Sequence, residues 1–444
     1  MAELREALVK AYFNLIHPVF PVVDQSQFLD EQGELTSELP PPLLYQAVLL
    51  VGAHVCTHPL VSKDRWALKA VLFRRASMLY HLREETDRLY LTQAALLFTW
   101  HIHDGDTVAG GPWYWTGIAV RLNYGQGTHR HNSFLPTREH ALHKRLWWST
   151  FVLEVFAALE LGRPCGVHWE GSDQQLLTDE DLNYGRPYSG QQACDTSICT
   201  SSNDMTVADY HAGFVRLAYI GIDIGRMGFQ AGSSTLTVSS IDSRLAAWML
   251  QTRLSSPMLD EGFLKRHLRL HYHLLVLFLH RMYVQKSDVS RSACSLASDS
   301  ILHILDMLRA HDEMPRCHST IVTVVTAVGT QVVSDLRSAL AINAHLTAMA
   351  LLDRLARVIQ HTKSLIPLWP NAEAVYNIFE SLHKDYQALV TQSHATGFSE
   401  ATVAVPESLL DWPALFISHS ANEDTQIHSP DLRWAELLDW TEGL

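Results

Sequence analysis

Two adjacent segments of the chain decide its fold: GPWYWTGIAVRLNYGQGTHRH at 111–131 and PTREHALHKRLWWSTFVLEVFAALELGRP at 136–164. Each carries two closely spaced tryptophans, which are Trp113, Trp115, Trp147 and Trp148. The second segment is apolar nearly all round over 136–161, a pattern that indicates a buried helix. Gly162 at the C′ position with Pro164 just beyond it is a strong stop signal. We therefore expect two helices joined by a short break.

Helical patterns recur along most of the chain. Within 64–82 the apolar residues step by three to five positions and form roughly one stripe. Comparable patterns occupy 3–16, 41–56, 87–102, 206–227, 240–253, 260–284, 291–310, 317–335, 338–362 and 370–391. The β-branched stretch 321–328 has no pairing partner nearby, so we interpret it as part of a buried helix. No repeat of fixed period occurs, and the sequence predicts an all-α fold of a dozen or so packed helices.

Composition divides the chain into a helical domain at 10–391 and a tail at 395–444. The domain has its core motifs at 12–182 and its later helices at 206–391. Between them Ser, Gly, Gln, Asn, Cys and Thr dominate residues 184–206, which predicts a mobile loop.

The tail alternates acidic and bulky hydrophobic residues in two patches, 407–416 and 431–440, separated by a polar spacer. This pattern is typical of activation segments that stay partly disordered until they dock in a partner's groove. The residues that we assign to such an activation tail are Leu410, Trp412, Phe416, Trp434, Leu438 and Trp440. The alternative is a terminal helix that packs against its own core.

Composition and charge argue against several classes of protein. The 444 residues carry 34 basic against 47 acidic side chains, a net charge of −13, and no run of Lys or Arg exceeds two. A DNA-binding domain usually carries a basic patch or stripe, so this chain is a poor DNA binder by itself. The longest uncharged stretch, 39–62, contains three consecutive prolines, which argues against a membrane span. Six cysteines without a Cys-x-x-Cys pair argue against a disulfide scaffold and a closely spaced zinc cage.

The motifs that would support catalysis are missing. The chain has neither a GxxxxGK phosphate loop nor a GxSxG nucleophile motif, and no second acidic motif accompanies Asp179-Glu180-Asp181. The histidines invite a metal interpretation, because His54 and His58 have the i, i+4 spacing of ligands on one helical face. Similar sets occur at 101–106 and 267–273, but each lacks an acidic partner at diagnostic spacing. We interpret them as structural residues and expect neither an enzyme nor a resident metal.

Several motifs in a fixed order carry a resemblance to a known family. They are YFNLIHPVFPVVDQSQF (12–28), Phe73-Arg74-Arg75-Ala76, Asp87-Arg88-Leu89, Gln93-Ala94-Ala95-Leu96-Leu97, Trp113-x-Trp115-x-Gly117-x-Ala119, Gly127-Thr128-His129-Arg130, Arg145-Leu146-Trp147-Trp148, Leu161-Gly162-Arg163-Pro164 and Leu177-Thr178-x-Glu180-Asp181. Residues 268–282 and 369–382 match later helices. Over about 10–390 the chain resembles the regulatory ("middle homology") domain of fungal zinc-cluster transcription factors, of the cutinase and acetamidase regulator sub-type.

The resemblance implies a transcription regulator of the nucleus, or one that shuttles with the cytoplasm, acting on a catabolic or specialised-metabolite gene set. Its partners would be the transcription machinery or a DNA-binding protein, together with a small-molecule effector. The family usually carries a six-cysteine zinc cluster, and the cysteines here lack that spacing. DNA contact is therefore expected to be missing or supplied by a partner, and zinc only if an upstream cluster exists. The alternative is a helical protein-interaction module or small-molecule sensor with no direct role at DNA.

The candidate site residues come from the two opening segments. They are Trp113, Trp115, His129, Arg130, Arg145, Trp147, Trp148 and Arg163. In one interpretation they form a packing seam, since each tryptophan buries on the order of 150–250 Å². The three arginines would then lie at or near helix ends, where cations suit the helix dipole. In the other interpretation, implied by the resemblance, Trp113, Trp115, His129 and Arg163 face a pocket for a small effector.

Overall fold

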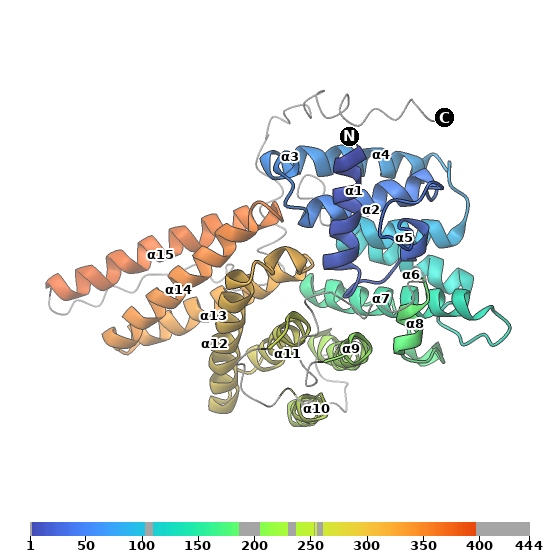
Figure 1. Ribbon diagram of the computed structural model, residues 1–444. Helices are drawn as coiled ribbons and strands as arrows, with labels where there is room; N and C mark the ends of the chain where they lie inside the picture. The colour runs from blue at the N-terminus through green and yellow to red at the C-terminus, as the bar shows by residue number, and fades with distance from the viewer. Residues whose placement is uncertain are drawn as a thin grey trace.

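The computed structural model describes residues 2–102, 110–185, 205–229, 237–252, 254 and 261–396 (Figure 1). These residues form fifteen α-helices, connected by turns that include three 3₁₀ helices and one π-helical turn. Their one β pairing is an isolated bridge between Leu29 and Leu35. The predicted all-α class is therefore confirmed. In the same ranges no helix combines the length and the hydrophobicity that a membrane crossing needs.

The helices divide into an earlier and a later group along the chain. The earlier helices are α1 (Ala2–Ala11), α2 (Pro42–Val55), α3 (Pro59–Lys63), α4 (Arg65–His81), α5 (Arg88–Phe98), α6 (Pro112–Gln126), α7 (Thr137–Glu160) and α8 (Asp179–Asn183). The later helices are α9 (Val207–Phe229), α10 (Val238–Gln251), α11 (Phe263–Arg281), α12 (Asp288–Ala310), α13 (Thr320–Ala341), α14 (His345–Leu365) and α15 (Asn371–Thr396).

Most predicted helices agree with these bounds, and 321–328 lies inside α13. The helix predicted at 3–16 is divided, because α1 ends at Ala11 and a π-helical turn follows over Tyr12–Ile16. The five-residue helices α3 and α8 were not predicted, since so few residues show no period. The predicted loop at 184–206 and the tail at 395–444 fall mostly outside the described residues. The six residues assigned to the activation tail all lie outside them.

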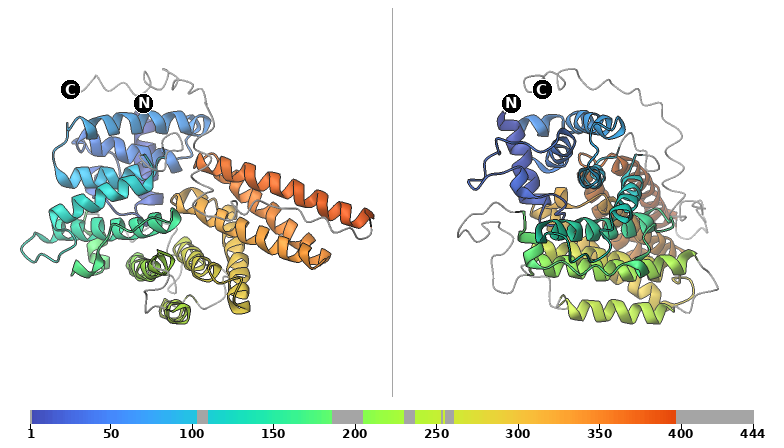
Figure 2. Two further views of the ribbon diagram at one scale, coloured as in Figure 1. Left: turned by 180° about the vertical axis from the view of Figure 1, so that it is seen from behind. Right: turned by 90° about the vertical axis from the view of Figure 1, so that its right-hand side faces the viewer.

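The helices pack as a body with an arm (Figures 1 and 2). α2 lies in the middle of the first group, in contact with α1, α4 and α5, and α5 leads through α6 to α7. α7 connects the two groups, because it contacts both α9 and α13. α11 packs against α9 and α12, while α13, α14 and α15 pack side by side and project from the body.

Close approach of α1 explains a glycine in α2. All thirteen residues of α2 from Leu43 to Val55 are buried. A Cβ atom added at Gly52 would lie 2.1 Å from the backbone oxygen of Leu8 on α1. Only glycine therefore allows α1 and α2 this separation.

The stop signal predicted at Gly162 is confirmed, and a second left-handed glycine ends α6. Gly127 ends α6 with a φ of 75°, and Gly162 follows α7 with a φ of 59°. The left-handed conformation at Gly162 turns the chain so that the Arg163 amide donates to the Ala158 carbonyl at 2.8 Å. This turn positions Arg163 beside the start of α6.

Candidate functional site

Trp113 and Arg163 form a stacked pair between the two opening segments. Trp113 lies in the first turn of α6, and the guanidinium carbon of Arg163 lies 4.4 Å from its ring centroid. This is the geometry of a cation–π interaction. Both side chains are half-buried, so the pair closes a seam at the surface of the body.

Trp115 belongs to a separate aromatic cluster in the core. Its ring centroid lies 4.8 Å from that of Phe98, 5.6 Å from Tyr80 and 6.1 Å from Phe73. These partners come from α5 and α4, so Trp115 packs α6 against both helices.

His129 and Trp147 form a third group with Tyr124. The His129 ring centroid lies 4.9 Å from Tyr124 and 5.7 Å from Trp147. Burial, assisted by the Arg130 charge, lowers the pKa of His129. The Arg130 side chain is exposed, while its backbone carbonyl accepts a hydrogen bond from Gln174 Nε2 at 3.1 Å. These contacts fix the turn after α6 against α7.

Arg145 corrects one expectation, because it does not lie at a helix end. It is fully buried in the first half of α7 and reaches back to the N-terminal loop. Its guanidinium donates to the carbonyls of Pro21 at 3.2 Å and Val23 at 2.9 Å, and to the carboxylate of Asp24. Arg145 therefore ties two segments more than a hundred residues apart, rather than capping its own helix.

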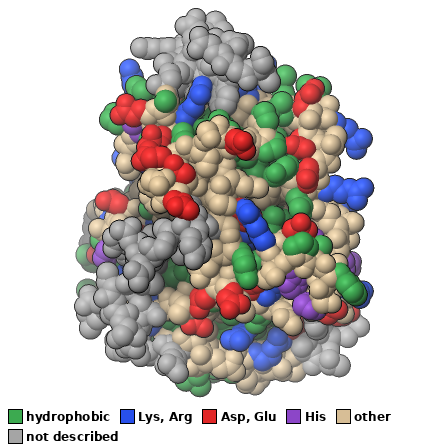
Figure 3. Space-filling model, turned by 45° about the vertical axis from the view of Figure 1, so that its right-hand side comes forward, with side chains coloured by type: hydrophobic (Ala, Val, Ile, Leu, Met, Phe, Trp, Pro, Cys, Tyr) green, Lys and Arg blue, Asp and Glu red, His purple; other side chains and the backbone are tan. Residues whose placement is uncertain are grey.

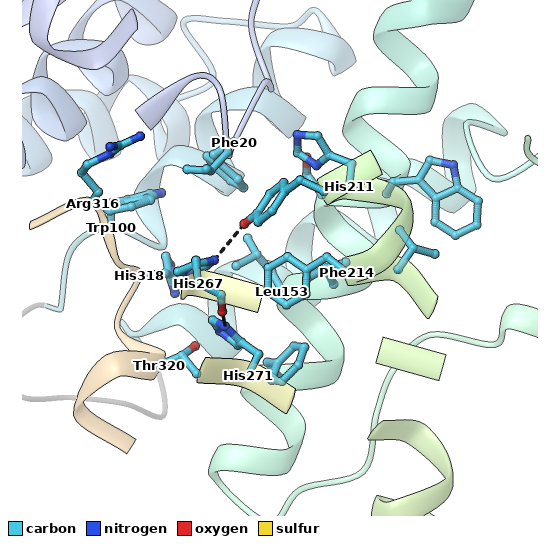
Figure 4. A pocket seen from close by; sticks show the side chains of 17 residues that line it. Phe20, Trp100, Leu153, His211, Phe214, His267, His271, Arg316, His318 and Thr320 are labelled. Carbon is cyan, nitrogen blue, oxygen red and sulfur yellow. Dashed lines mark hydrogen bonds between the residues drawn. The ribbon is translucent and has the colours of Figure 1, made fainter. Parts of the chain in front are cut away.

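Trp148 is the candidate residue that lines a cavity. Its Nε1 atom donates to the Gln175 carbonyl at 2.7 Å. The cavity has a volume of about 60 Å³ and lies where α7, α9 and α11 meet the start of α13 and the loops carrying Phe20 and Trp100 (Figure 4). None of the other seven candidate residues lines it. The structure brings Trp113 together with Arg163 and His129 together with Trp147, but it places Trp115 and Arg145 in separate contacts.

We call this space the histidine cavity. Its polar lining residues are Tyr210, His211, His267, His271, Arg316, His318, Ser149 and Thr320. Its apolar walls include Phe20, Trp100, Val152, Leu153, Phe156 and Phe214. One water needs roughly 10–15 Å³ of such space, so the histidine cavity has room for a small molecule.

Hydrogen bonds connect the histidines to the surrounding backbone and hydroxyl groups. The Tyr210 hydroxyl lies 2.9 Å from His267 Nδ1, and His271 Nδ1 lies 2.8 Å from the His267 carbonyl (Figure 4). His211 Nε2 donates to the Pro18 carbonyl at 3.1 Å, and His318 Nε2 lies 3.1 Å from Thr99 Oγ1. The rings are thus held in fixed orientations.

Burial decides the charge of these rings. It lowers the pKa of His211 and of His271 to about 4 and that of His318 to about 3. Burial also holds the pKa of His267 well below its usual range. All four imidazoles are therefore neutral at pH 7.

Arg316 is the charged side chain in the lining. Its guanidinium stacks 3.9 Å from the Phe263 ring centroid, and its Nε atom donates to the Leu15 carbonyl at 3.3 Å. Its Nη1 atom lies 3.8 Å from Glu313 Oε1, while Nη2 is buried without a hydrogen-bond partner among the described residues. The cavity lining is thus uncharged except at this edge.

The sequence contained one signal for this cavity. His267 and His271 stand at i, i+4 on one face of α11, a spacing that raised the metal interpretation. Within the described ranges no group of three or more His, Cys, Asp or Glu side chains is placed to hold a metal ion. The other walls come from the loops at Phe20 and Trp100 and from residues 316–320. These segments lie far apart in the sequence, so no local sequence pattern predicts that they meet.

Comparison with known proteins shows what this chain is similar to. Residues 9–204 match the fungal specific transcription factor domain. The family resemblance predicted from the motifs is therefore confirmed. On the face shown in Figure 3, acidic and basic side chains are interspersed, and the basic ones form no continuous patch there.

Individual relatives carry the names of regulators. The chain is 33% identical to an acetamidase regulatory protein of Aspergillus fumigatus, over 89% of this chain and 51% of that protein. It is 31% identical to the acetamidase regulatory protein of Emericella nidulans, over 87% of this chain and 48% of that protein. Cutinase transcription factor 1 alpha of Fusarium vanettenii is 26% identical over 85% of this chain and 43% of its own length. The chain thus spans about half the length of these relatives, and no solved structure matches it.

Proposed function

We propose that this chain is the helical regulatory portion of a fungal transcription regulator that works in the nucleus and controls a catabolic or specialised-metabolite gene set. The observation that carries the proposal is similarity along 89% of the chain to a protein named as a regulator, with the family domain at 9–204. No catalytic role is included in the proposal.

The net charge of the chain affects whether it would bind DNA directly. At a net charge of −13, the chain as a whole repels a phosphate backbone. We therefore assign DNA contact to a partner protein rather than to the helical body. The same charge supports the alternative function, a protein-interaction module or sensor with no direct role at DNA.

The tail at 395–444 is the segment proposed to contact the transcription machinery. Its acidic and aromatic residues suit an amphipathic segment that folds in a partner's apolar groove. The helical body would then regulate when that contact is made.

The histidine cavity is the place proposed for a small-molecule effector. Its walls come from Phe20 and Trp100 in the N-terminal group and from α9, α11 and α13 in the later group. A ligand held there would contact both groups of helices, including α7 of the earlier group. Binding would therefore favour the arrangement of helices that completes the cavity.

A reporter assay tests the proposal. The full chain is fused to a heterologous DNA-binding domain with its binding sites upstream of a reporter gene. We expect reporter expression to change several-fold relative to the DNA-binding domain alone, and the change to shrink when 395–444 is deleted. A paired Trp412→Ala, Trp434→Ala variant tests the tail without shortening the chain. Expression equal to that of the DNA-binding domain alone under every growth condition tried would contradict regulation and favour the alternative.

A further inference from the structure

We propose that the histidine cavity binds a small uncharged molecule with a hydroxyl group on an apolar body, and that His267 and His271 recognise the hydroxyl. The inference rests on the proposed function in taking this cavity as the effector site. It adds the chemical class of the effector and the residues that select it.

The tautomer of His271 follows from its backbone contact. His271 Nδ1 lies 2.8 Å from the His267 carbonyl oxygen, which can only accept a hydrogen bond. Nδ1 therefore carries the proton of the neutral ring, and Nε2 carries a lone pair. Among the described residues no group donates to this Nε2 atom. His271 thus offers an acceptor that a ligand can use.

The tautomer of His267 follows from Tyr210. The Tyr210 hydroxyl lies 2.9 Å from His267 Nδ1, and in the described part of the chain it has no other hydrogen-bond partner. If the hydroxyl donates, its one proton is satisfied; if it accepted, that proton would be buried without a partner. We therefore assign Nδ1 as the acceptor and Nε2 as the protonated atom. His267 thus offers a donor.

A hydroxyl group matches this pair of rings. Both rings line the cavity and their centroids lie 4.5 Å apart, so we infer that one small ligand group can reach the donor of His267 and the acceptor of His271. A hydroxyl both donates and accepts, and can satisfy both rings at once. A purely apolar ligand would leave both nitrogens unpaired, and a buried polar group without a partner destabilises the complex.

Charged ligands fit the lining less well. An ammonium group would lie near the Arg316 guanidinium and lose its water in a mostly apolar space. A carboxylate would face the lone pair of His271 Nε2. The one group that favours an anion is Arg316, whose Nη2 atom has no hydrogen-bond partner among the described residues. An anionic competitor therefore belongs in the test.

The apolar walls select the body of the ligand. Trp100, Leu153, Phe156 and Phe214 surround the histidines, and the volume of about 60 Å³ exceeds several-fold the roughly 10–15 Å³ that one water needs. A single aromatic ring or a short aliphatic chain suits this space. Phenol, toluene and benzoate share a ring and differ in the group that would meet the histidines.

Calorimetry and thermal unfolding of the full chain with these three probes test the inference. We expect phenol to bind, to raise Tm, and to bind at least about tenfold more tightly than toluene or benzoate, a difference of about 1.4 kcal/mol. Equal binding of phenol and toluene would overturn the role of the histidines. Tighter binding of benzoate, or binding of no probe to the folded chain, would overturn the ligand class.

Two variants locate the binding. His271→Phe removes the acceptor, and we expect phenol to lose its advantage over toluene. The matched control is His311→Phe just after the end of α12, because His311 is exposed and its Nδ1 atom also lies 2.8 Å from the carbonyl four residues earlier. A phenol preference that survives His271→Phe in a folded protein contradicts the inference. The reporter assay tests the proposed function separately. The ligand inference and the proposed function can therefore fail independently.

Discussion

The guanidinium of Arg163 stacks 4.4 Å from the Trp113 ring and joins the end of α7 to the start of α6. Two residues fifty positions apart in the sequence thus close one seam. Gly162 makes the contact geometrically accessible, since its φ of 59° turns the chain back toward α6. The pair is half-buried, so its interaction energy is modest.

Removing this pair tests its contribution to stability. We expect Arg163→Ala to lower the free energy of unfolding by about 0.5–1 kcal/mol, because a cation–π contact at a partly exposed site is worth about that much. A double-mutant cycle with Trp113→Ala measures the coupling by urea denaturation. Arg291→Ala is the control, since Arg291 makes only exposed contacts, an ion pair with Asp288 at 2.8 Å and a hydrogen bond to the Val284 carbonyl at 3.4 Å. Zero coupling between Arg163 and Trp113 would show that the stacking contributes no stability.

The buried pair of Arg145 and Asp24 should matter far more. Asp24→Asn removes the negative charge that pairs with the buried Arg145 guanidinium and leaves it only neutral oxygen acceptors, among them the carbonyls of Pro21 and Val23. Breaking a buried pair from one side costs about 3–5 kcal/mol, and we expect a loss of that size in urea denaturation.

Asp24 has a second partner that provides the control. Arg138 Nε lies 3.1 Å from Asp24 Oδ2, but the Arg138 side chain is 54% exposed. We expect Arg138→Ala to cost no more than about 1 kcal/mol, as exposed ion pairs do. Equal losses for Asp24→Asn and Arg138→Ala would contradict the special role of the buried contact.

The close packing of α1 on α2 predicts that alanine substitutions at two glycines have opposite effects on stability. At Gly52 a Cβ atom would lie 2.1 Å from Leu8 O, so we expect Gly52→Ala to destabilise the protein by about 1–3 kcal/mol or more. Gly125 in α6 has nothing within 4 Å of such an atom. We expect Gly125→Ala to raise the free energy of unfolding by roughly 0.5–1 kcal/mol, because glycine is a poor helix former. Thermal unfolding of both variants compares them, and a stabilised Gly52→Ala would mean that α1 can move away.

Local patterns predicted much of this architecture, for identifiable physical reasons. The glycine stop at Gly162 and the apolar character of α7 are properties of neighbouring residues, so the sequence shows them directly. The burial of Arg145 could not be predicted from the local sequence, because its partner Asp24 lies 121 positions earlier. An arginine near apolar residues looks the same whether it caps a helix or pairs across the core.

The histidine cavity was even harder to predict from local sequence patterns. Its walls combine Phe20, Trp100, His211, His271 and His318, whose positions span nearly three hundred residues. Only the i, i+4 spacing within α11 hinted at it, and that spacing fits a metal site as well as a cavity wall. Tertiary packing decides whether histidines at this spacing bind a metal or line a cavity.

The neutral histidines of the cavity predict a loss of stability in mild acid. An unfolded histidine titrates near pH 6.5, whereas burial lowers the pKa of His211 and His271 in the folded chain to about 4. Between these values the unfolded chain binds protons that the folded chain does not. The free energy of unfolding is therefore highest above about pH 6.5 and falls as the pH drops toward 4, by up to about 1.4 kcal/mol per pH unit for each such histidine.

Urea midpoints measured between pH 7.5 and 5 check this dependence, and His271→Phe supplies the decisive comparison. Removing one titrating group should make the decline with falling pH shallower, while other buried histidines, such as His211 and His318, keep it from vanishing. Arg316 and Tyr210 line the same cavity in both proteins and keep their charges across this range, so they do not produce the difference. His311→Phe, at the exposed position that follows α12, should leave the slope as it is. An unchanged slope in His271→Phe would mean that its ring takes up protons in the folded chain as readily as in the unfolded one.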